Sequence, residues 1–248
     1  MMIARSDESE PDELGEMIEE LRAAHSSDLH IGRDGGDRGI GGLRRVVDAA
    51  SDAHAHVLLL AGDIFDHSKL SDELLADVAA ILESAAFRTV ILPGNHDPLI
   101  AGSPYHRLPA IERVRVLGLP DASVAFDDLG LEVLGEPHET YDDKHPLPQP
   151  REANGRRRIV MAHGHYVSGP HDLHRAWLIR DDDIAALGAD YVALGHWDRR
   201  ERVGRAPHFA HYSGSPDLAR SINIARFANG SGATVVARSL EDGKETAA

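Results

Sequence analysis

The sequence predicts a single α/β domain in which strands and helices alternate along the chain. Two observations predict it. In the first half of the 248 residues, short apolar runs alternate with stretches whose apolar residues recur at helical spacing. In addition, five apolar runs each end in a short polar block that contains Asp, Asn or His. In open sheets of this kind ligands bind at the carboxyl ends of the strands, so these polar residues are candidates for a functional site.

The N-terminal segment has a helical pattern that conflicts with the strand expected after it. Apolar residues recur at i, i+3, i+4 and i+7 from Leu14 to Leu21, which predicts an amphipathic helix over residues 11–23. A polar metal ligand at a strand end would instead require residues 21–27 to be extended. We therefore interpret residues 1–20 as an extension, partly helical or disordered, that precedes the domain.

After this segment the order is regular. Apolar spacing predicts helices around residues 43–50 and 74–82, and short apolar runs predict strands at 57–61 and 89–92. The second half is richer in strands, which we expect at 114–117, 124–126, 131–134, 158–162, 191–194, 209–212, 222–227 and 234–238. Residues 136–157 are rich in Pro, Asp, Lys and Arg and predict a surface loop, and residues 239–248 predict a disordered tail.

The net charge, the lack of cysteine and the length of the apolar runs exclude several classes of function. A net charge of −15 argues against binding nucleic acid through a generally basic surface. The absence of cysteine excludes disulfides and thiolate metal sites, which leaves His, Asp, Asn and Glu as ligands. No apolar run reaches the roughly 20 residues that span a bilayer, and the first residues lack the apolar core of a signal peptide. We therefore expect a cytoplasmic protein without a membrane partner.

The polar residues after the apolar runs have the chemistry of a metal site. Asp28 and His30 are two residues apart, so on an extended segment both side chains point the same way. Asp63 follows an apolar strand, and a carboxylate there can bridge two cations. Asn95 offers a neutral carbonyl oxygen, and His96 beside it is left free for proton chemistry.

Each of these positions alone also has a structural explanation. Asp28 and Asp63 could cap a turn or a helix, and Asn95 could supply a left-handed turn. His163 and His196, which end later apolar runs, could be hydrogen-bonded core histidines. All five polar blocks in this order favour a metal site.

The sequence resembles the calcineurin-like metallophosphoesterase superfamily, and within it the SbcD-type DNA repair exonucleases are most similar. The resemblance covers about residues 21–220. It implies a four-layered α/β sandwich of two mixed β-sheets flanked by helices, with residues 21–238 as the phosphoesterase domain. It is carried by residues 27–32, 61–66, 93–97, His163 and 193–196, and for the exonuclease group by the Tyr-Ser-Gly-Ser-Pro stretch at 212–216.

The resemblance implies a dinuclear site that holds two divalent cations and a bridging hydroxide. Mn²⁺ is the metal that it suggests. His96 would be the catalytic histidine, Asp66 would support the metal ligands, and Asp97 would orient His96 by a hydrogen bond. The implied ligands are Asp28, His30 and Asp198 for the first cation, Asp63 as the bridge, and Asn95, His163 and His196 for the second.

Two positions leave alternatives open. Asp198 stands where the family usually has a second histidine, and it could pair with Arg199, Arg200 or Arg202 instead of binding metal. His165 competes with His163, which we prefer because it follows the apolar strand directly.

Two further residues separate this chain from the phosphoprotein phosphatases of the superfamily. Those enzymes carry Arg after the second Asp of the Gly-Asp block and Glu after Asn-His, whereas His67 and Asp97 occupy these positions here.

We therefore predict a metal-dependent phosphodiesterase. It is either a DNA exonuclease of SbcD type or a hydrolase of small phosphodiesters or nucleotides. The chain is shorter than a full SbcD-type nuclease with its capping region, and its acidic balance offers little grip on a long phosphate backbone. The partners are a phosphoester substrate, with nucleic acid and an SbcC-like ATPase left open. A weakly active, metal-binding regulatory subunit is the alternative from another class.

Overall fold

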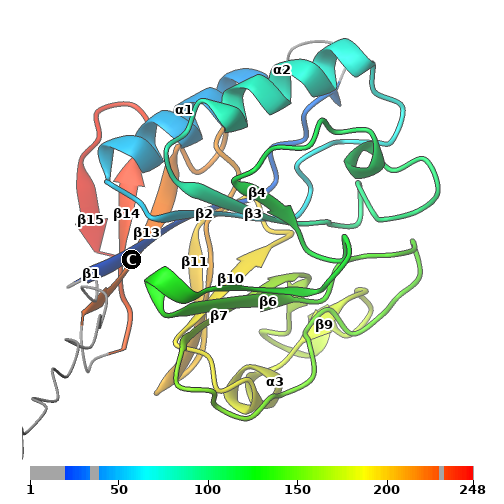
Figure 1. Cartoon of the computed structure of the whole chain (residues 1–248). Coiled ribbons are helices and arrows are strands. Elements are labelled where there is room, and N and C mark those ends of the chain that lie inside the picture. The colour runs from blue at the N-terminus through cyan, green and yellow to red at the C-terminus, as the bar shows by residue number, and fades with distance from the viewer. Residues whose placement is uncertain (1–19, 34–38, 229–231, 248) are drawn as a thin grey trace, which may run out of the picture.

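Two mixed β-sheets face each other at the centre of the molecule (Figure 1). The structure, a computed structural model, describes residues 20–33, 39–228 and 232–247. Within these residues one sheet has seven strands and the other has six. In spatial order, the seven-stranded sheet contains β15 (Glu245–Ala247), β14 (Thr234–Ser239), β13 (Ser221–Ala228), β1 (Glu20–Ser26), β2 (Val57–Ala61), β3 (Arg88–Leu92) and β4 (Val114–Val116). The six-stranded sheet contains β11 (Glu201–Arg205), β12 (His208–Tyr212), β10 (Tyr191–Gly195), β7 (Arg157–His163), β6 (Leu131–Gly135) and β5 (Ser123–Phe126).

Helices complete the four layers. The helices α1 (Ile40–Asp52) and α2 (Asp72–Glu83) cover the outer face of the seven-stranded sheet, and α3 (Asp181–Ala186) lies beyond the other sheet (Figure 1). A small separate ladder pairs β8 (His165–Tyr166) with β9 (Leu178–Ile179). The predicted α/β sandwich of two mixed sheets flanked by helices is confirmed.

The apolar pattern of β2 explains how the layers hold together. Its five residues are all buried, because both faces of this strand are covered. Leu58 and Leu60 pack beneath the helices, whereas Val57 and Leu59 face the second sheet. The inter-sheet core that they join also contains Ile159 from β7. The strand therefore links the helix layer to the space between the sheets.

The two long helices form as their apolar spacing predicts. In α1, Leu43, Val46 and Val47 are buried on one face. In α2, the Ser71 hydroxyl accepts a hydrogen bond of 3.2 Å from the Leu74 backbone N–H, which satisfies one of the free donors at the helix start.

Strand directions bring the polar blocks to one end of the molecule. In the first sheet, β1, β2 and β3 are parallel neighbours. In the second sheet, β7 and β10 are parallel, with His163 opposite Gly195. The carboxyl ends of these five strands meet, since His163 at the end of β7 contacts Ala61 at the end of β2.

Two predictions about the chain ends are wrong within the described residues. Residues 20–26 form strand β1, paired with β2 and β13, and not the end of a helix. The rest of that predicted helix lies outside the described residues. The predicted disordered tail is also wrong as far as residue 247, because β15 pairs with β14 after a short turn. The predicted loop at 136–157 is confirmed up to the start of β7.

No helix in the described ranges has the length and apolar character needed to cross a membrane.

Candidate metal centre

The structure brings six of the seven predicted ligands together where strands of the two sheets end. Asp63 lies at the middle of the group. Its Oδ2 is 3.2 Å from His163 Nε2 and 4.0 Å from His30 Nε2, while its Oδ1 accepts a 2.9 Å hydrogen bond from the His96 backbone N–H. A carboxylate with histidines on either side is placed to bridge two cations.

One half of the group is built from Asn95, His163 and His196. Asn95 Oδ1 lies 3.1 Å from His163 Nε2 and 3.1 Å from His196 Nδ1. On its other side, His163 Nδ1 lies 2.9 Å from the Ala61 carbonyl oxygen, to which it donates. This hydrogen bond fixes the ring orientation and leaves Nε2 facing the shared space, which is the arrangement of a histidine that binds metal.

The other half contains Asp28, His30 and Asp63, whose ligand atoms all lie within 4.8 Å of one another. Asp28 is buried, and its two carboxylate oxygens lie 3.1 and 3.2 Å from the His196 backbone N–H, which donates to them. Asp66 Oδ1 lies 3.0 Å from His30 Nδ1, and because no hydrogen bond joins the two atoms, this ring nitrogen has no hydrogen-bond partner among the described residues.

Electrostatics indicate that the buried carboxylates of this group need a positive charge beside them. Burial raises the pKa of Asp28 to about 7, with His163 opposing the rise and the Asp63 carboxylate adding to it. Burial also opposes the charged forms of Asp63 and His163, yet their mutual attraction prevails. It lowers the pKa of Asp63 and raises that of His163 to about 9. Divalent cations would stabilise both buried carboxylates and take the place of the histidine proton, so the donors fit the metal pair.

Backbone strain concentrates at the same residues. Outside glycine, few residues adopt a positive φ, and those that do cost free energy. Four predicted ligands do so here: Asp28 (54°), His30 (48°), Asp63 (52°) and His196 (95°). Strain that gathers at one group of polar side chains is typical of a functional site.

Gly62 allows the close packing behind His163. It has a φ of 89°, and a Cβ at this position would overlap His163 Nδ1. We expect Gly62→Ala to lower the free energy of unfolding by about 2 kcal/mol or more and to weaken metal binding. Urea denaturation with and without Mn²⁺ measures both effects.

Gly102 provides the matched control for this prediction. Its φ of 86° is nearly the same, but a Cβ there would meet nothing within 4 Å. Gly102→Ala therefore carries the backbone strain without the overlap. Equal losses in the two variants would contradict the role assigned to the contact with His163.

His96 differs from its neighbours because its side chain is 42% exposed. Its Nδ1 lies 3.1 Å from the Asp66 carbonyl oxygen, and its ring meets the His30 ring edge-on at 4.8 Å. The ligand atoms of His30, Asp66 and His96 also lie within 4.8 Å of one another. A partly exposed imidazole at the edge of the group can reach a bound substrate.

The predicted hydrogen bond from Asp97 to His96 is wrong. The Asp97 carboxylate is buried and accepts from the backbone N–H groups of Phe65 and Gly94, at 2.9 and 2.6 Å, and from the Tyr105 hydroxyl at 2.6 Å. Asp97 therefore ties together the loops that follow β2 and β3.

The structure separates His163 from its competitor His165. His165 Nε2 lies 3.0 Å from Asp172 Oδ1, and Asp172 in turn accepts a 2.8 Å hydrogen bond from the Ser168 hydroxyl. His165 is therefore held by another partner, whereas His163 faces Asp63 and Asn95.

Asp198 is more exposed than the six other predicted ligands. It is exposed and lines a hollow of about 270 Å³ together with Asp28 and His30. Its ligand atoms belong to neither of the two groups with atoms within 4.8 Å that the described residues form. The alternative partners were Arg199, Arg200 and Arg202, and among the residues described none of them forms an ion pair with Asp198. The side chain is therefore available at the edge of the hollow.

The stretch 212–216 borders this hollow. Ser215 lines it, and the Ser215 backbone N–H donates to the Asp198 carbonyl oxygen at 3.0 Å. The Tyr212 hydroxyl donates to the Gly164 carbonyl oxygen at 2.7 Å. The stretch therefore connects the ends of β7 and β10.

Sequence reasoning missed two residues behind the metal ligands. His138 Nε2 lies 2.8 Å from the His163 carbonyl oxygen, to which it donates, and the Trp177 ring packs against His138 at 5.1 Å and His196 at 5.7 Å. Both lie outside the strands and helices, so no periodic pattern marks them.

The calcineurin-like phosphoesterase family matches residues 21–200, which include all the predicted site residues. The chain belongs to this family. It is accordingly a metallophosphoesterase, a hydrolase that acts on phosphoester bonds, and the family's site holds two divalent metal ions.

Three known proteins show how far the likeness extends. The SbcD component of the SbcCD nuclease of Bacillus subtilis (strain 168) is 28% identical over 84% of this chain and 64% of its own length. The uncharacterized metallophosphoesterase YhaO of the same organism is 27% identical over 75% of this chain and 50% of its own. The chain thus spans between half and just under two thirds of these relatives. Purple acid phosphatase PPD1 from yellow lupin seeds is 11% identical, with a TM-score of 0.62 over 92% of this chain and 53% of that one, and this likeness shows the fold.

Proposed function

We propose that this metallophosphoesterase hydrolyses phosphodiesters through two Mn²⁺ ions. The buried group of carboxylates and imidazoles around Asp63 is the observation that supports this most strongly, because its members share one space and burial opposes the charge of both Asp28 and Asp63. In this proposal Asp28, His30 and Asp198 would hold the first cation, Asn95, His163 and His196 would hold the second, and Asp63 would contribute to both.

Two cations bound by these residues would supply a hydroxide at neutral pH and would stabilise the charge that develops on the phosphoryl oxygens. The chain's residues do the rest. Asn95 contributes a ligand without adding negative charge. His96 extends from the edge of the group and donates a proton to the leaving oxygen. The donors are oxygen and nitrogen without sulfur, a set that suits Mn²⁺.

The charges around the hollow favour a diester over a monoester. Its acidic residues include Asp198 and Asp217, and Arg33, its one basic residue among those described, lies 3.0 Å from Asp66. A phosphomonoester carries about two negative charges at neutral pH, whereas a diester carries one. The lining also includes the apolar Leu29 and Leu218, which suits an esterified organic group.

Two substrate classes remain for this diesterase. The similarity to a nuclease component supports DNA, and with it an SbcC-like ATPase as a partner. The net charge of −15 and the acidic edge of the hollow support small phosphodiesters or nucleotides, because a long polyanion gains affinity from basic contacts. We place the small diesters first.

A substrate panel tests the proposal. With Mn²⁺, we expect hydrolysis of bis-p-nitrophenyl phosphate to exceed that of p-nitrophenyl phosphate, and EDTA to abolish both. Cyclic nucleotides and single-stranded DNA in the same assay separate the two substrate classes. If all the diesters stay intact, the diesterase proposal is wrong.

The same panel addresses the non-enzymatic alternative. A regulatory subunit that binds metal would take up two ions per chain, as mass spectrometry can count, yet would hydrolyse none of these esters above a metal-free control.

Asp198 provides a prediction about the first cation. We expect Asp198→Ala to weaken Mn²⁺ binding at one of the two sites by about tenfold, because a ligand at the edge is lost while the buried group remains. Titration calorimetry with Mn²⁺ measures the two affinities.

Asp217→Ala is the control, since Asp217 lines the same hollow and forms an ion pair with Arg45. If the two variants bind Mn²⁺ alike, Asp198 is not a ligand.

A further inference from the structure

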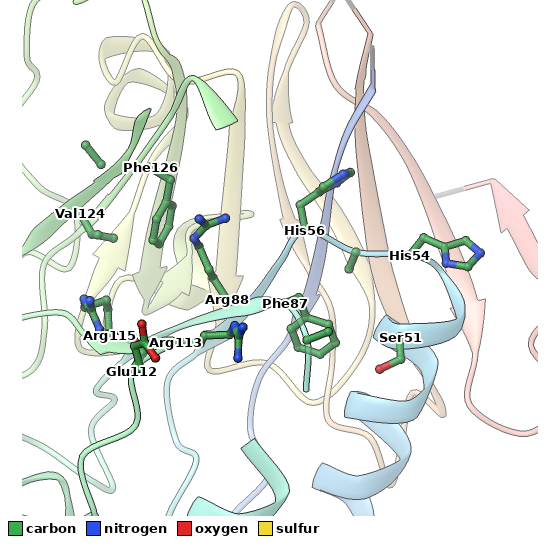
Figure 2. Close-up of a pocket in the computed structure, with 13 residues that line it drawn as sticks. Ser51, His54, His56, Phe87, Arg88, Glu112, Arg113, Arg115, Val124 and Phe126 are labelled. Atoms are coloured by element: carbon green, nitrogen blue, oxygen red, sulfur yellow. Dashed lines mark hydrogen bonds between the residues drawn. The ribbon is translucent and has the colours of Figure 1, made fainter. Parts of the chain in front are cut away.

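A second and larger hollow lies at the opposite end of the strands from the metal centre. It has a volume of about 820 Å³, within the range of small-molecule sites. Its walls come from the end of α1, from the segments that lead into β2, β3 and β4 together with the first residues of β3 and β4, and from the edge strand β5; Figure 2 shows these lining residues. The metal ligands follow the other ends of β2 and β3, so the two hollows are separate.

The hollow is basic in a protein that is strongly acidic. Its lining includes the arginines Arg88, Arg113 and Arg115 and a single carboxylate, Glu112, whereas the whole chain carries a net charge of −15. In Figure 2 the arginines lie on one side, and two histidines that line the hollow lie on the other. A cluster of guanidinium groups on a protein whose net charge is negative is typical of a site that binds anions.

These arginines are available to a ligand. Arg115 Nη1 donates to the backbone carbonyls of Glu112 and Val114, at 2.8 and 2.9 Å, and its other side-chain donors form no hydrogen bond with the described residues. Arg113 forms no side-chain hydrogen bond or ion pair with any other residue that the structure describes.

Arg88 has only an exposed ion pair, 2.8 Å from Asp128, and such pairs contribute little to stability. Its guanidinium carbon lies 5.1 Å from the centre of the Phe126 ring, which orients it toward the hollow.

The remaining lining is small and apolar. Ala55, Ala86, Ala125 and Val124 leave room that a bare phosphate ion would not fill. His56 adds a neutral polar edge, because burial and then the neighbouring Arg22 hold the pKa of this imidazole below its usual value. The ligand that fits combines a phosphate with an uncharged organic part.

We propose that this hollow binds a small organic phosphate, such as a nucleotide, at a site distinct from the metal centre. The arginines would hold the phosphate by charge-assisted, bidentate hydrogen bonds. The alanine wall would contact the organic part.

Titration calorimetry of the full chain with AMP tests this proposal. AMP also binds to metal ions, so the titration is run on the Mn²⁺-loaded protein and again in EDTA. Binding in the hollow depends on arginines and should persist in EDTA. We expect Arg113→Gln with Arg115→Gln to weaken the EDTA-resistant binding by about tenfold or more, while hydrolysis of bis-p-nitrophenyl phosphate by the loaded enzyme stays unchanged.

Two further variants make the test specific. Ala86→Glu places a carboxylate in the wall and should likewise weaken the EDTA-resistant binding of AMP. Arg44→Gln with Arg180→Gln removes the same charge from exposed positions outside the lining and should leave it intact.

The proposal is overturned by any of three results. AMP binding could disappear entirely in EDTA, or the control pair could lose as much affinity as the hollow pair. Inorganic phosphate could also bind as tightly as AMP, which would make the hollow a general anion patch. None of these results depends on which ester the metal centre hydrolyses.

Discussion

Asp63→Asn should nearly abolish hydrolysis. Asp63 is buried between His30 and His163, and the amide keeps its shape while removing the charge that would bridge two cations. We expect kcat/KM to fall by about 1000-fold or more, which corresponds to about 4 kcal/mol of transition-state stabilisation. Metal content should fall from two ions per chain to one or none. Bis-p-nitrophenyl phosphate hydrolysis and mass spectrometry of the metal content measure the two effects.

Asp182→Asn is the matched control, because it makes the same chemical change on the exposed face of α3. It should leave the rate and the metal content unchanged. An Asp63→Asn enzyme that keeps both metals and most of its activity would show that another group bridges the cations.

His96→Ala should separate catalysis from metal binding. His96 is the exposed member of the group, and in our proposal it holds no metal. We expect kcat to fall by between about 10² and 10⁴, the range for loss of a general acid, while both cations stay bound. The deficit should shrink for substrates with better leaving groups, since these need less protonation.

His67→Ala is the control on the same side of the molecule, because His67 is exposed and its Nδ1 accepts a hydrogen bond from the Lys69 backbone N–H. Loss of one metal ion in His96→Ala would contradict the assignment. It would instead favour a metal site made of His30, Asp66 and His96, whose ligand atoms also lie close together.

The sequence predicted the core elements of the fold because their apolar residues follow a simple periodicity. Strand β2 was predicted with its observed bounds, and α1 and α2 were predicted from apolar spacing. Strand β1 was mistaken for part of a helix. Leu21 and Ala23 face the inter-sheet core while Ala24 faces the helix layer, and a strand covered on both faces does not alternate between polar and apolar residues.

The strands that the sequence did not predict form because they pair with a neighbouring strand, and they have no pattern of apolar residues of their own. Strand β11 is mostly polar and exposed, and it forms at the sheet edge by pairing with β12. Strand β15 has three residues and pairs with β14, with Glu245 in an ion pair with Arg226 and 3.6 Å from Arg238. Neither contact can be inferred from neighbouring residues in the chain.

The candidate site was easier to predict than its surroundings. Its candidate ligands lie at or shortly after the ends of strands, and parallel strands end together, so Asp63 and Asn95 could be expected side by side. The partners that orient these side chains come from distant loops. Asp97 contacts Tyr105, and His138 contacts the His163 carbonyl group. Such contacts depend on loop conformation, which residue type alone does not determine.

The candidate metal ligands come from both sheets, so metal binding would stabilise the folded domain as a whole. Asp63 and Asn95 follow strands of the first sheet, whereas His163 and His196 belong to the second. A cation bound by all four would act as a reversible cross-link between the two halves of the protein. At a concentration 100 times its dissociation constant, one such ion adds about 2.7 kcal/mol to the free energy of unfolding. Metal supply would then control how long the folded protein survives as well as how fast it works.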